Sequence, residues 1–336
     1  MYTPTPELAD FVQSIPKTET HLHMEGACPF EMIQRVDPVR FASEPPMWND
    51  AFRYESFDQF MDLYNDFCGS VFNSAEAYYE CASKVLGKCA EQNVRYVETS
   101  FHAGALATCN LTGPQLIEAV ESAVPAGMTV HIFMGMCHND YHGATKEIIE
   151  DSLTWDGLYG IDLHGPEYIP MEDWTADVWS RAARAGKKLK AHAGEFMPAW
   201  FVKYCIEELG VRRIQHGVRC IEDEEVVDLI LKENVILDVC PISNVKLAVK
   251  GIASMADHPI RRLFDRGVVC TINSDDPFMF GNSLSEEYYA LSEDLDFSKS
   301  ELIQLARNGF LNADMGAEAR DQFLDELNDL ESSLGE

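Results

Sequence analysis

Positive charge is scarce in this sequence. Lysine and arginine total 26 against 56 aspartate and glutamate residues in a chain of 336, which gives a formal net charge of −30 at pH 7. Because a field of this sign repels polyanions, the composition argues against nucleic acid and anionic membranes as partners. We expect the excess acid to lie on a highly solvated surface.

Long apolar runs are missing as well. None approaches the roughly 20 residues that cross a bilayer, and the first 17 residues carry an acidic, helix-like stretch in place of a basic leader with an apolar centre. These absences predict a cytoplasmic protein.

No Cys-x-x-Cys pair occurs among the ten cysteines, which are scattered from Cys28 to Cys270. The chain is also far longer than a typical disulfide-stapled domain. We therefore expect most of these cysteines to be reduced, buried and packed as small hydrophobic side chains.

Apolar residues, by contrast, make up 46% of the chain, enough to bury a full core. Short apolar or β-branched runs alternate with amphipathic segments such as 197–209 and 222–233. This alternation indicates parallel βα units, closed as a barrel or open as a doubly wound sheet. The predicted strands are 17–23, 94–100, 129–136, 157–163, 187–192, 211–216, 235–239 and 268–273.

The closed (β/α)₈ barrel is the favoured fold. Residues capable of chemistry follow several of the eight strands, and a barrel gathers those strand ends around one mouth. An open sheet that binds a nucleotide would show a glycine-rich phosphate loop, and none is present. We see no domain boundary and expect one domain over residues 1–336.

The segment 24–93 is much longer than an ordinary βα connection and contains aromatic-rich helical sequence at 57–72. It predicts extra helices that cover the C-terminal mouth of the barrel. They could form a purely structural layer or a lid over the site, with Phe57 and Phe60 as apolar walls.

Four motifs carry side chains suited to metal binding and acid–base chemistry, and each stands at the end of a predicted strand. Two histidines separated by one residue on a strand point to the same side, so both can reach one ion. The motifs are His21-Leu22-His23, His192-Ala193-Gly194-Glu195, Gln215-His216-Gly217 and Ser274-Asp275-Asp276-Pro277.

Three imidazoles and one carboxylate, without a cysteine, suit zinc with a position left open for water. The predicted fourth strand continues as GIDLHGPE at 160–167 and holds no lysine that could bridge two metals. A single zinc ion per chain is therefore predicted.

With these motifs the chain resembles the adenosine/adenine deaminases of the amidohydrolase superfamily over nearly its whole length. The resemblance rests on six segments: THLHMEGA at 20–27, GIDLHGPE at 160–167, HAGE at 192–195, RIQHGVR at 213–219, CPISN at 240–244 and NSDDP at 273–277.

The resemblance implies a residue set for zinc-dependent deamination of a 6-aminopurine. It implies that Glu195 passes a proton to N1 of the purine and that His216 orients the attacking hydroxide. It also implies that Asp276 meets N7 and the backbone of Gly165 meets N3. The implied zinc ligands are His21, His23, His192 and Asp275, and the implied substrate contacts are His23, Glu25, Gly165 and Asp276.

The substrate is less clear from the motifs. Animal-type adenosine deaminases have an aspartate at the position of Glu25, whereas glutamate also occurs there in adenine deaminases. The loop GIDLHGPE looks more like the nucleoside type. Adenosine is the favoured substrate, and adenine or another 6-aminopurine nucleoside is the alternative. A non-catalytic purine-binding protein is a remote alternative, because Glu195 and all four ligands are present.

Five further histidines have no motif around them, and we expect ordinary surface or core roles for them: His102, His131, His138, His142 and His258. His258 precedes a proline and is typical of a helix start. Asn244, in CPISN, is interpreted either as a structural cap or as a residue that shapes the pocket.

Overall fold

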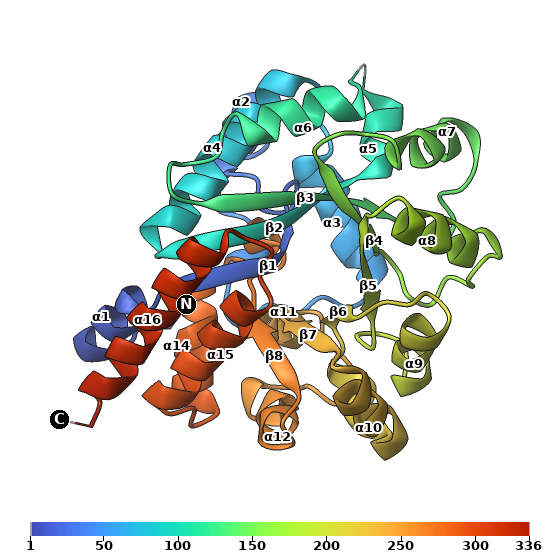
Figure 1. Cartoon of the computed structure of the whole chain (residues 1–336). Helices are drawn as coiled ribbons and strands as arrows, with labels where there is room; N and C mark the ends of the chain where they lie inside the picture. The colour runs from blue at the N-terminus through green and yellow to red at the C-terminus, as the bar shows by residue number, and fades with distance from the viewer. Residues whose placement is uncertain (1, 110, 336) are drawn as a thin grey trace.

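The computed structural model describes residues 2–109 and 111–335, and eight parallel strands form its centre (Figure 1). The strands pair in sequence order, each with the next. They are β1 (Lys17–His23), β2 (Val94–His102), β3 (Thr129–Met136), β4 (Leu158–Leu163), β5 (Lys188–Ala193), β6 (Arg213–His216), β7 (Ile236–Val239) and β8 (Val269–Ile272). The predicted barrel is confirmed, and every predicted strand lies within two residues of its observed bounds.

The last and first strands meet through the backbone just past β8. Leu22 and Asp275 form a parallel bridge, in which the Asp275 amide donates to the carbonyl of His21 and the His23 amide donates to the carbonyl of Asp275, each at 3.0 Å. This closure holds two histidines and an aspartate from the opposite ends of the chain at one point of the rim.

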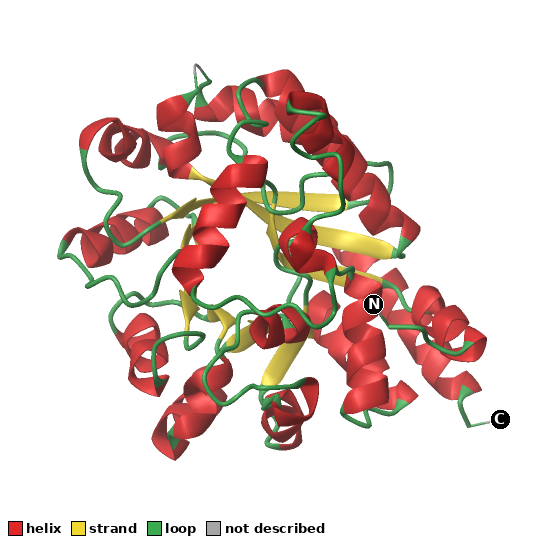
Figure 2. Ribbon diagram, turned by 180° about the vertical axis from the view of Figure 1, so that it is seen from behind, coloured by secondary structure: helices red, strands yellow, loops and turns green. Residues whose placement is uncertain are grey.

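Helices surround the barrel, and most of them connect one strand to the next (Figure 2). Those between β2 and β8 are α5 (Ala103–Thr108), α6 (Gly113–Glu121), α7 (Gly143–Ser152), α8 (Trp174–Arg184), α9 (Ala199–Glu207), η2 (Val218–Glu222), α10 (Glu224–Glu233), α11 (Pro241–Lys246), η3 (Met255–Asp257) and α12 (Ile260–Asp265). The helices before β1 and after β8 are α1 (Pro6–Ser14), α13 (Pro277–Phe280), α14 (Leu284–Asp294), α15 (Lys299–Leu311) and α16 (Ala317–Ser333).

The long connection after β1 folds into extra helices, as predicted. They are α2 (Phe30–Val36), η1 (Pro46–Trp48), α3 (Phe57–Cys68) and α4 (Ala75–Glu91). Ser56 caps α3 by accepting the amide of Gln59 at 3.1 Å. Figure 2 shows a helix at the place of α3 lying across the opening of the barrel.

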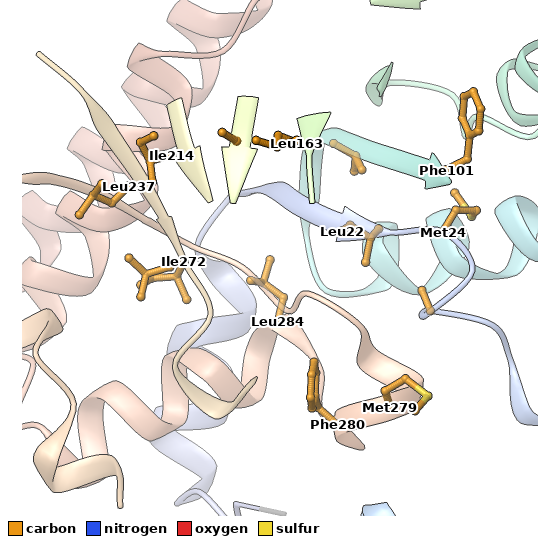
Figure 3. Packing of buried hydrophobic residues seen from close by; sticks show 14 of the residues in the cluster. Leu22, Met24, Phe101, Leu163, Ile214, Leu237, Ile272, Met279, Phe280 and Leu284 are labelled. Atoms are coloured by element: carbon orange, nitrogen blue, oxygen red, sulfur yellow. The ribbon is translucent and has the colours of Figure 1, made fainter. Parts of the chain in front are cut away.

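The apolar core lies between the strands and the surrounding helices. Figure 3 shows strand residues such as Leu163, Ile214, Leu237 and Ile272 in this layer, together with Leu284 of α14. Burial of many such side chains, each worth about 1.5–3 kcal/mol, fixes the strands and therefore the side chains at their ends. Among the described residues, no helix combines the length and the apolar composition that crossing a bilayer requires.

The interior of the barrel, below its mouth, is ionic. Lys190 Nζ lies 2.6 Å from Glu98 Oε2, and Arg213 lies 2.7 Å from Asp238 Oδ2 and 3.2 Å from Glu98 Oε1. All four residues lie on strands, and Glu98, Lys190 and Asp238 are buried. We call these residues the barrel ion cluster, in which two acids and two bases compensate one another.

All ten cysteines are free, and eight of them are buried, in line with the expectation from their spacing. The two that are only half-buried are Cys109 and Cys137.

Candidate active site

Four predicted metal ligands converge at the mouth of the barrel. His21 Nε2 lies 3.1 Å from His192 Nε2, and His23 Nε2 lies 3.2 Å from the same atom. Asp275 Oδ1 lies 3.3 Å from the Nε2 atoms of His21 and His23. These residues come from β1, from β5 and from the turn after β8. We call them the metal-ligand cluster.

The other ring nitrogen of each histidine has a partner outside the cluster. His21 Nδ1 lies 3.1 Å from a backbone carbonyl of β7, and His192 Nδ1 lies 3.2 Å from the carbonyl of Leu163. A carbonyl can only accept, so both Nδ1 atoms carry the proton and both Nε2 atoms present lone pairs. His23 Nδ1 lies 2.8 Å from the hydroxyl of Ser100. Lone pairs that face one another at about 3 Å need a cation between them, so the residues present fit a metal ion.

Asp275 takes its position from an unusual backbone conformation. Its φ of 65° lies in the left-handed region, which is costly for a residue with a side chain. The hydroxyl of Ser243 donates to Asp275 Oδ2 at 2.6 Å, which leaves Oδ1 for the histidines. Burial would raise the pKa of Asp275, but the imidazoles of His21 and His23 outweigh it and hold that pKa well below its usual range.

His216 reaches the site in the same way. The side chain of the preceding Gln215 points into the barrel and donates to Asp238 at 3.0 Å. Regular strand alternation would turn His216 outward, but its φ of 62° turns the ring into the mouth. His216 Nε2 then lies 3.5 Å from Glu195 Oε2 and 3.8 Å from Asp275 Oδ2.

Glu195 lies buried beside the metal-ligand cluster, with 4% of its surface exposed. Burial is the main cause that raises its pKa well above the usual value, and the negative charges of Asp275 and Glu167 add to it. The amide of Asn244 donates to Glu195 Oε1 at 3.2 Å. A carboxyl group whose pKa is raised in this way keeps its proton to a higher pH than an exposed carboxyl group does and can act as an acid.

Glu167, which the sequence reasoning did not assign, holds the loop that carries Glu195. Its carboxylate accepts the backbone amides of Glu195, Phe196 and Met197 at 3.0, 3.1 and 2.6 Å. Glu167 lies within the GIDLHGPE segment, but nothing in that segment indicates that its side chain binds the loop after β5.

Asn244 and His258 fix the protonation of His216. His258 Nδ1 accepts the amide of Ile260 at 3.2 Å, so its Nε2 carries the proton and donates to Asn244 Oδ1 at 3.1 Å. The Asn244 amide nitrogen then donates to His216 Nδ1 at 3.1 Å as well as to Glu195. His216 therefore carries its own proton on Nε2, where it faces Glu195.

This network resolves two expectations. Asn244 shapes the site rather than acting as a remote cap. His258 precedes α12, as expected for a helix start, but it also orients Asn244. No local pattern signals this second role, because it depends on how the long connection between β7 and β8 folds back on itself.

A cavity of about 320 Å³ opens beside the metal-ligand cluster. Its polar end contains His23, His192, Glu195, His216, Asp275 and Asp276, and Gly165 also lines it. Its apolar wall comes from α3, where Phe57, Phe60, Met61 and Tyr64 recur at helical spacing and share one face. The predicted walls Phe57 and Phe60 are both present.

Asp276 and Gly165, two predicted substrate contacts, both line this cavity. Burial, followed by the charge of Asp275, raises the pKa of Asp276 well above its usual value. Gly165 has a φ of 83°, a conformation that favours glycine, and an added Cβ would lie 2.5 Å from Cys137 Sγ.

Glu25, the remaining predicted substrate contact, is bound by side chain and backbone groups of α4 and β2. Its carboxylate accepts the hydroxyl of Tyr78 at 2.8 Å and the backbone amide of His102 at 3.3 Å. It is buried, and it is not among the described residues that line the cavity. The sequence motif gave no sign of Tyr78, which lies on α4.

Several other side chains line the cavity without having been predicted, and three of them carry atoms that can bind a metal. These three are His102, Cys137 and His164, at the ends of β2, β3 and β4. His131 stacks on Tyr159 at a ring distance of 3.8 Å, and His138 bonds a backbone carbonyl at 2.8 Å, in line with structural roles.

Comparison with known proteins gives a consistent result. Residues 16–330 match the family model described as adenosine deaminase. The adenine deaminase of Wolinella succinogenes is 32% identical over 317 residues, which span 91% of this chain and 94% of that protein. The adenine deaminase of Hahella chejuensis is 30% identical over 331 residues, or 95% and 98% of the two chains.

A solved structure agrees with both relatives. The crystal structure of adenine deaminase from Arthrobacter aurescens has a TM-score of 0.83 and 27% sequence identity, and the match covers 94% of this chain and 98% of that one. Over nearly its whole length, therefore, the chain belongs to the adenosine/adenine deaminase family of metal-dependent amidohydrolases.

Proposed function

We propose that this protein hydrolyses adenine to hypoxanthine and ammonia with the help of one zinc ion. Family membership supports deamination of an aminopurine. The observation that carries the proposal is the position of Glu195, a buried acid with a raised pKa, between the metal-ligand cluster and a cavity of about 320 Å³. This volume lies at the small end of the range for ligand sites, about 300–1,000 Å³.

Zinc fits the metal-ligand cluster by its donor chemistry. Three imidazoles and one carboxylate are nitrogen and oxygen ligands of the kind that zinc takes in catalytic sites with an open position. When bound, zinc would lower the pKa of a coordinated water from 15.7 to about 7 and so supply hydroxide at neutral pH.

Glu195 is proposed as the proton carrier of the reaction. Because its pKa is raised, Glu195 can hold a proton and give it to N1 of the purine as water oxygen adds at C6. It can then take one proton of the added water and pass it to the departing amine, and the second proton of that water returns Glu195 to its starting state. The overall change is adenine plus water to hypoxanthine plus ammonia.

His216 is proposed to stabilise the oxygen that is added at C6. Its Nε2 carries the proton, because Asn244 donates to its Nδ1. That N–H faces the space between Glu195 and Asp275, at 3.5 and 3.8 Å from their carboxylate oxygens. A fixed donor at such a point stabilises charge that develops during the reaction.

Asp276 and Gly165 are proposed to hold the purine ring. Because its pKa is raised, Asp276 can donate a proton to the acceptor N7. The absence of a side chain at Gly165 lets the backbone approach N3. The apolar face of α3 would cover the ring.

The motifs alone favour adenosine as the substrate. Two observations support adenine instead. The curated relatives described above are named adenine deaminases. In addition, Glu25, at the position where animal-type adenosine deaminases contact the ribose, is bound by Tyr78 and the His102 backbone and is not among the described residues that line the cavity. Adenosine remains the second candidate, because the GIDLHGPE loop is of the nucleoside type.

A kinetic panel tests the proposal. The kcat/KM of the zinc-loaded protein is measured for adenine, adenosine, deoxyadenosine and methylthioadenosine through loss of absorbance and release of ammonia. We expect adenine to give the highest value. A higher value for adenosine would overturn the substrate but keep the chemistry, and no turnover of any aminopurine would overturn the proposed function.

A further inference from the structure

Three side chains with donor atoms suited to a metal meet at the ends of β2, β3 and β4, which lie between β1 and β5 in the barrel. They are His102, at the end of β2, Cys137, directly after β3, and His164, directly after β4. Their donor atoms all lie within 4.8 Å of one another. We call them the His–Cys–His cluster.

The spacing of the two imidazoles repeats that of the metal-ligand cluster. His102 Nδ1 and His164 Nε2 lie 2.9 Å apart, close to the 3.1 and 3.2 Å between the ligand nitrogens there. Either pair can share one proton, and a cation can take the place of that proton. The third donor, the sulfur of Cys137, adds a thiolate, which zinc and similar ions bind well.

Each of the three side chains occupies space that a glycine leaves open. An added Cβ at Gly135 would lie 2.2 Å from the His164 ring, and one at Gly104 would lie 2.6 Å from His102 Nε2. An added Cβ at Gly165 would lie 2.5 Å from Cys137 Sγ. Because larger residues at these positions would displace the donor atoms, the backbone is shaped around the cluster.

The carboxylate of Asp140 lies next to the His–Cys–His cluster. Asp140 Oδ2 accepts the backbone amide of Cys137 at 2.6 Å and lies 3.9 Å from His102 Nε2. A histidine that binds a metal through one nitrogen commonly directs its other nitrogen to a carboxylate. His102 has this arrangement, with Nδ1 toward His164 and Nε2 toward Asp140.

We propose that His102, Cys137 and His164 form a second binding site for a divalent cation of the zinc type, with its open coordination position directed to the substrate cavity. All three residues line that cavity. The rings of His164 and His23 lie 5.6 Å apart, so the second site neighbours the first. The two sites share no ligand, so the second does not require the lysine bridge of binuclear relatives.

Cobalt(II) provides a probe that separates the two sites. The metal-ligand cluster has only nitrogen and oxygen donors, whereas the His–Cys–His cluster has a thiolate, which gives Co²⁺ a near-ultraviolet charge-transfer band. Metal-free protein is titrated with Co²⁺, and bound metal is counted while the band is recorded. We expect two equivalents to bind and the thiolate band to accompany one of them.

Two cysteine variants assign the band. Cys137→Ser should bind one equivalent and lose the band. Cys109→Ser, which changes the other half-buried cysteine, should keep two equivalents and the band. His102→Ala serves as a second variant and should also bind one equivalent, and circular dichroism checks that each variant is folded. One equivalent in the unmodified protein, or a band that persists in Cys137→Ser, would overturn the second site.

Discussion

Two charged regions share the inside of this barrel, and they are built in opposite ways. In the barrel ion cluster, two acids face two bases at 2.6 to 3.2 Å. At the mouth, Glu195, Asp275 and Asp276 are buried together, and no lysine or arginine among the described residues forms an ion pair with them. The pKa values follow this difference. At Asp238, Arg213 and Lys190 outweigh burial and lower the pKa. At Glu195 and Asp276, burial and the charge of Asp275 both raise the pKa.

The difference separates a structural region from a functional one. In the barrel ion cluster, acids and bases of the chain compensate one another and hold the strands. At the mouth, acids and nitrogen lone pairs lack such partners, because a cation and a substrate complete the site there. Buried acids and lone pairs without a partner lower the stability of the protein when no ligand is bound. Titratable groups with shifted pKa values are typical of active sites.

Glu195→Gln should have the largest effect. The amide keeps the shape of the side chain but cannot carry the proton, so kcat for adenine should fall by about 10²–10⁴-fold. Bound metal and the thermal unfolding midpoint should stay near their original values. Glu225→Gln, at an exposed position of α10, is the matched control and should keep full activity. Turnover of Glu195→Gln within tenfold of the original would remove Glu195 from the mechanism.

A pair of isosteric changes compares the two regions directly. Asp238→Asn leaves the buried Arg213 and Lys190 short of a counter-charge and should lower the free energy of unfolding by about 3–5 kcal/mol. Asp276→Asn removes an acid that burial and Asp275 disfavour, and should change the stability of the metal-free protein little or raise it. Denaturant unfolding measures both. Equal losses for the two variants would contradict the contrast between the regions.

The barrel ion cluster also predicts a pH dependence of stability. Burial would raise the pKa of Asp238, but Arg213 and Lys190 outweigh it and lower the pKa from 3.8 to about 2. The folded protein thus binds this proton more weakly than the unfolded chain. The weaker proton binding contributes about 2 kcal/mol to the free energy of unfolding. This contribution is present above pH 4 and is lost as the pH falls toward 2.

The measurement is the free energy of unfolding against pH for the original protein and for Asp238→Asn. The gap between the two curves should be widest above pH 4 and should narrow toward pH 2. A gap that stays constant over this range would show that Asp238 has no depressed pKa.

His258→Phe should have the smallest effect. It removes the donor that orients Asn244, so the amide of Asn244 no longer holds the proton of His216 on Nε2. The expected loss in kcat is about fivefold, corresponding to a single neutral hydrogen bond of about 1 kcal/mol, with KM little changed. His131→Phe, at a stacked position away from the site, is the control. An unchanged kcat in His258→Phe would show that Asn244 is held without it.

The strands and the four motifs could be predicted because they depend on local patterns. Apolar runs of strand length and two-residue spacing place His21 and His23 on one side, and a barrel brings their strand end to those of His192 and Asp275. The left-handed backbone at His216 and Asp275 was not foreseeable from these patterns, yet it turns both side chains into the mouth.

Residues that act through another residue could not be predicted. Glu167 binds the loop after β5, and His258 reaches Asn244 only after the long connection between β7 and β8 has folded back on itself. Glu25 is turned toward Tyr78 by the packing of α4. These contacts depend on tertiary structure, for which a single sequence carries no periodic signal.

The central claim is that three histidines and Asp275 hold the cation with which Glu195 deaminates adenine. The most direct test is release of ammonia from adenine by metal-free protein that is reloaded with zinc. The account predicts that the original protein regains activity with zinc while His192→Ala stays inactive at any zinc concentration. Full activity of the metal-free protein or of zinc-loaded His192→Ala would contradict it.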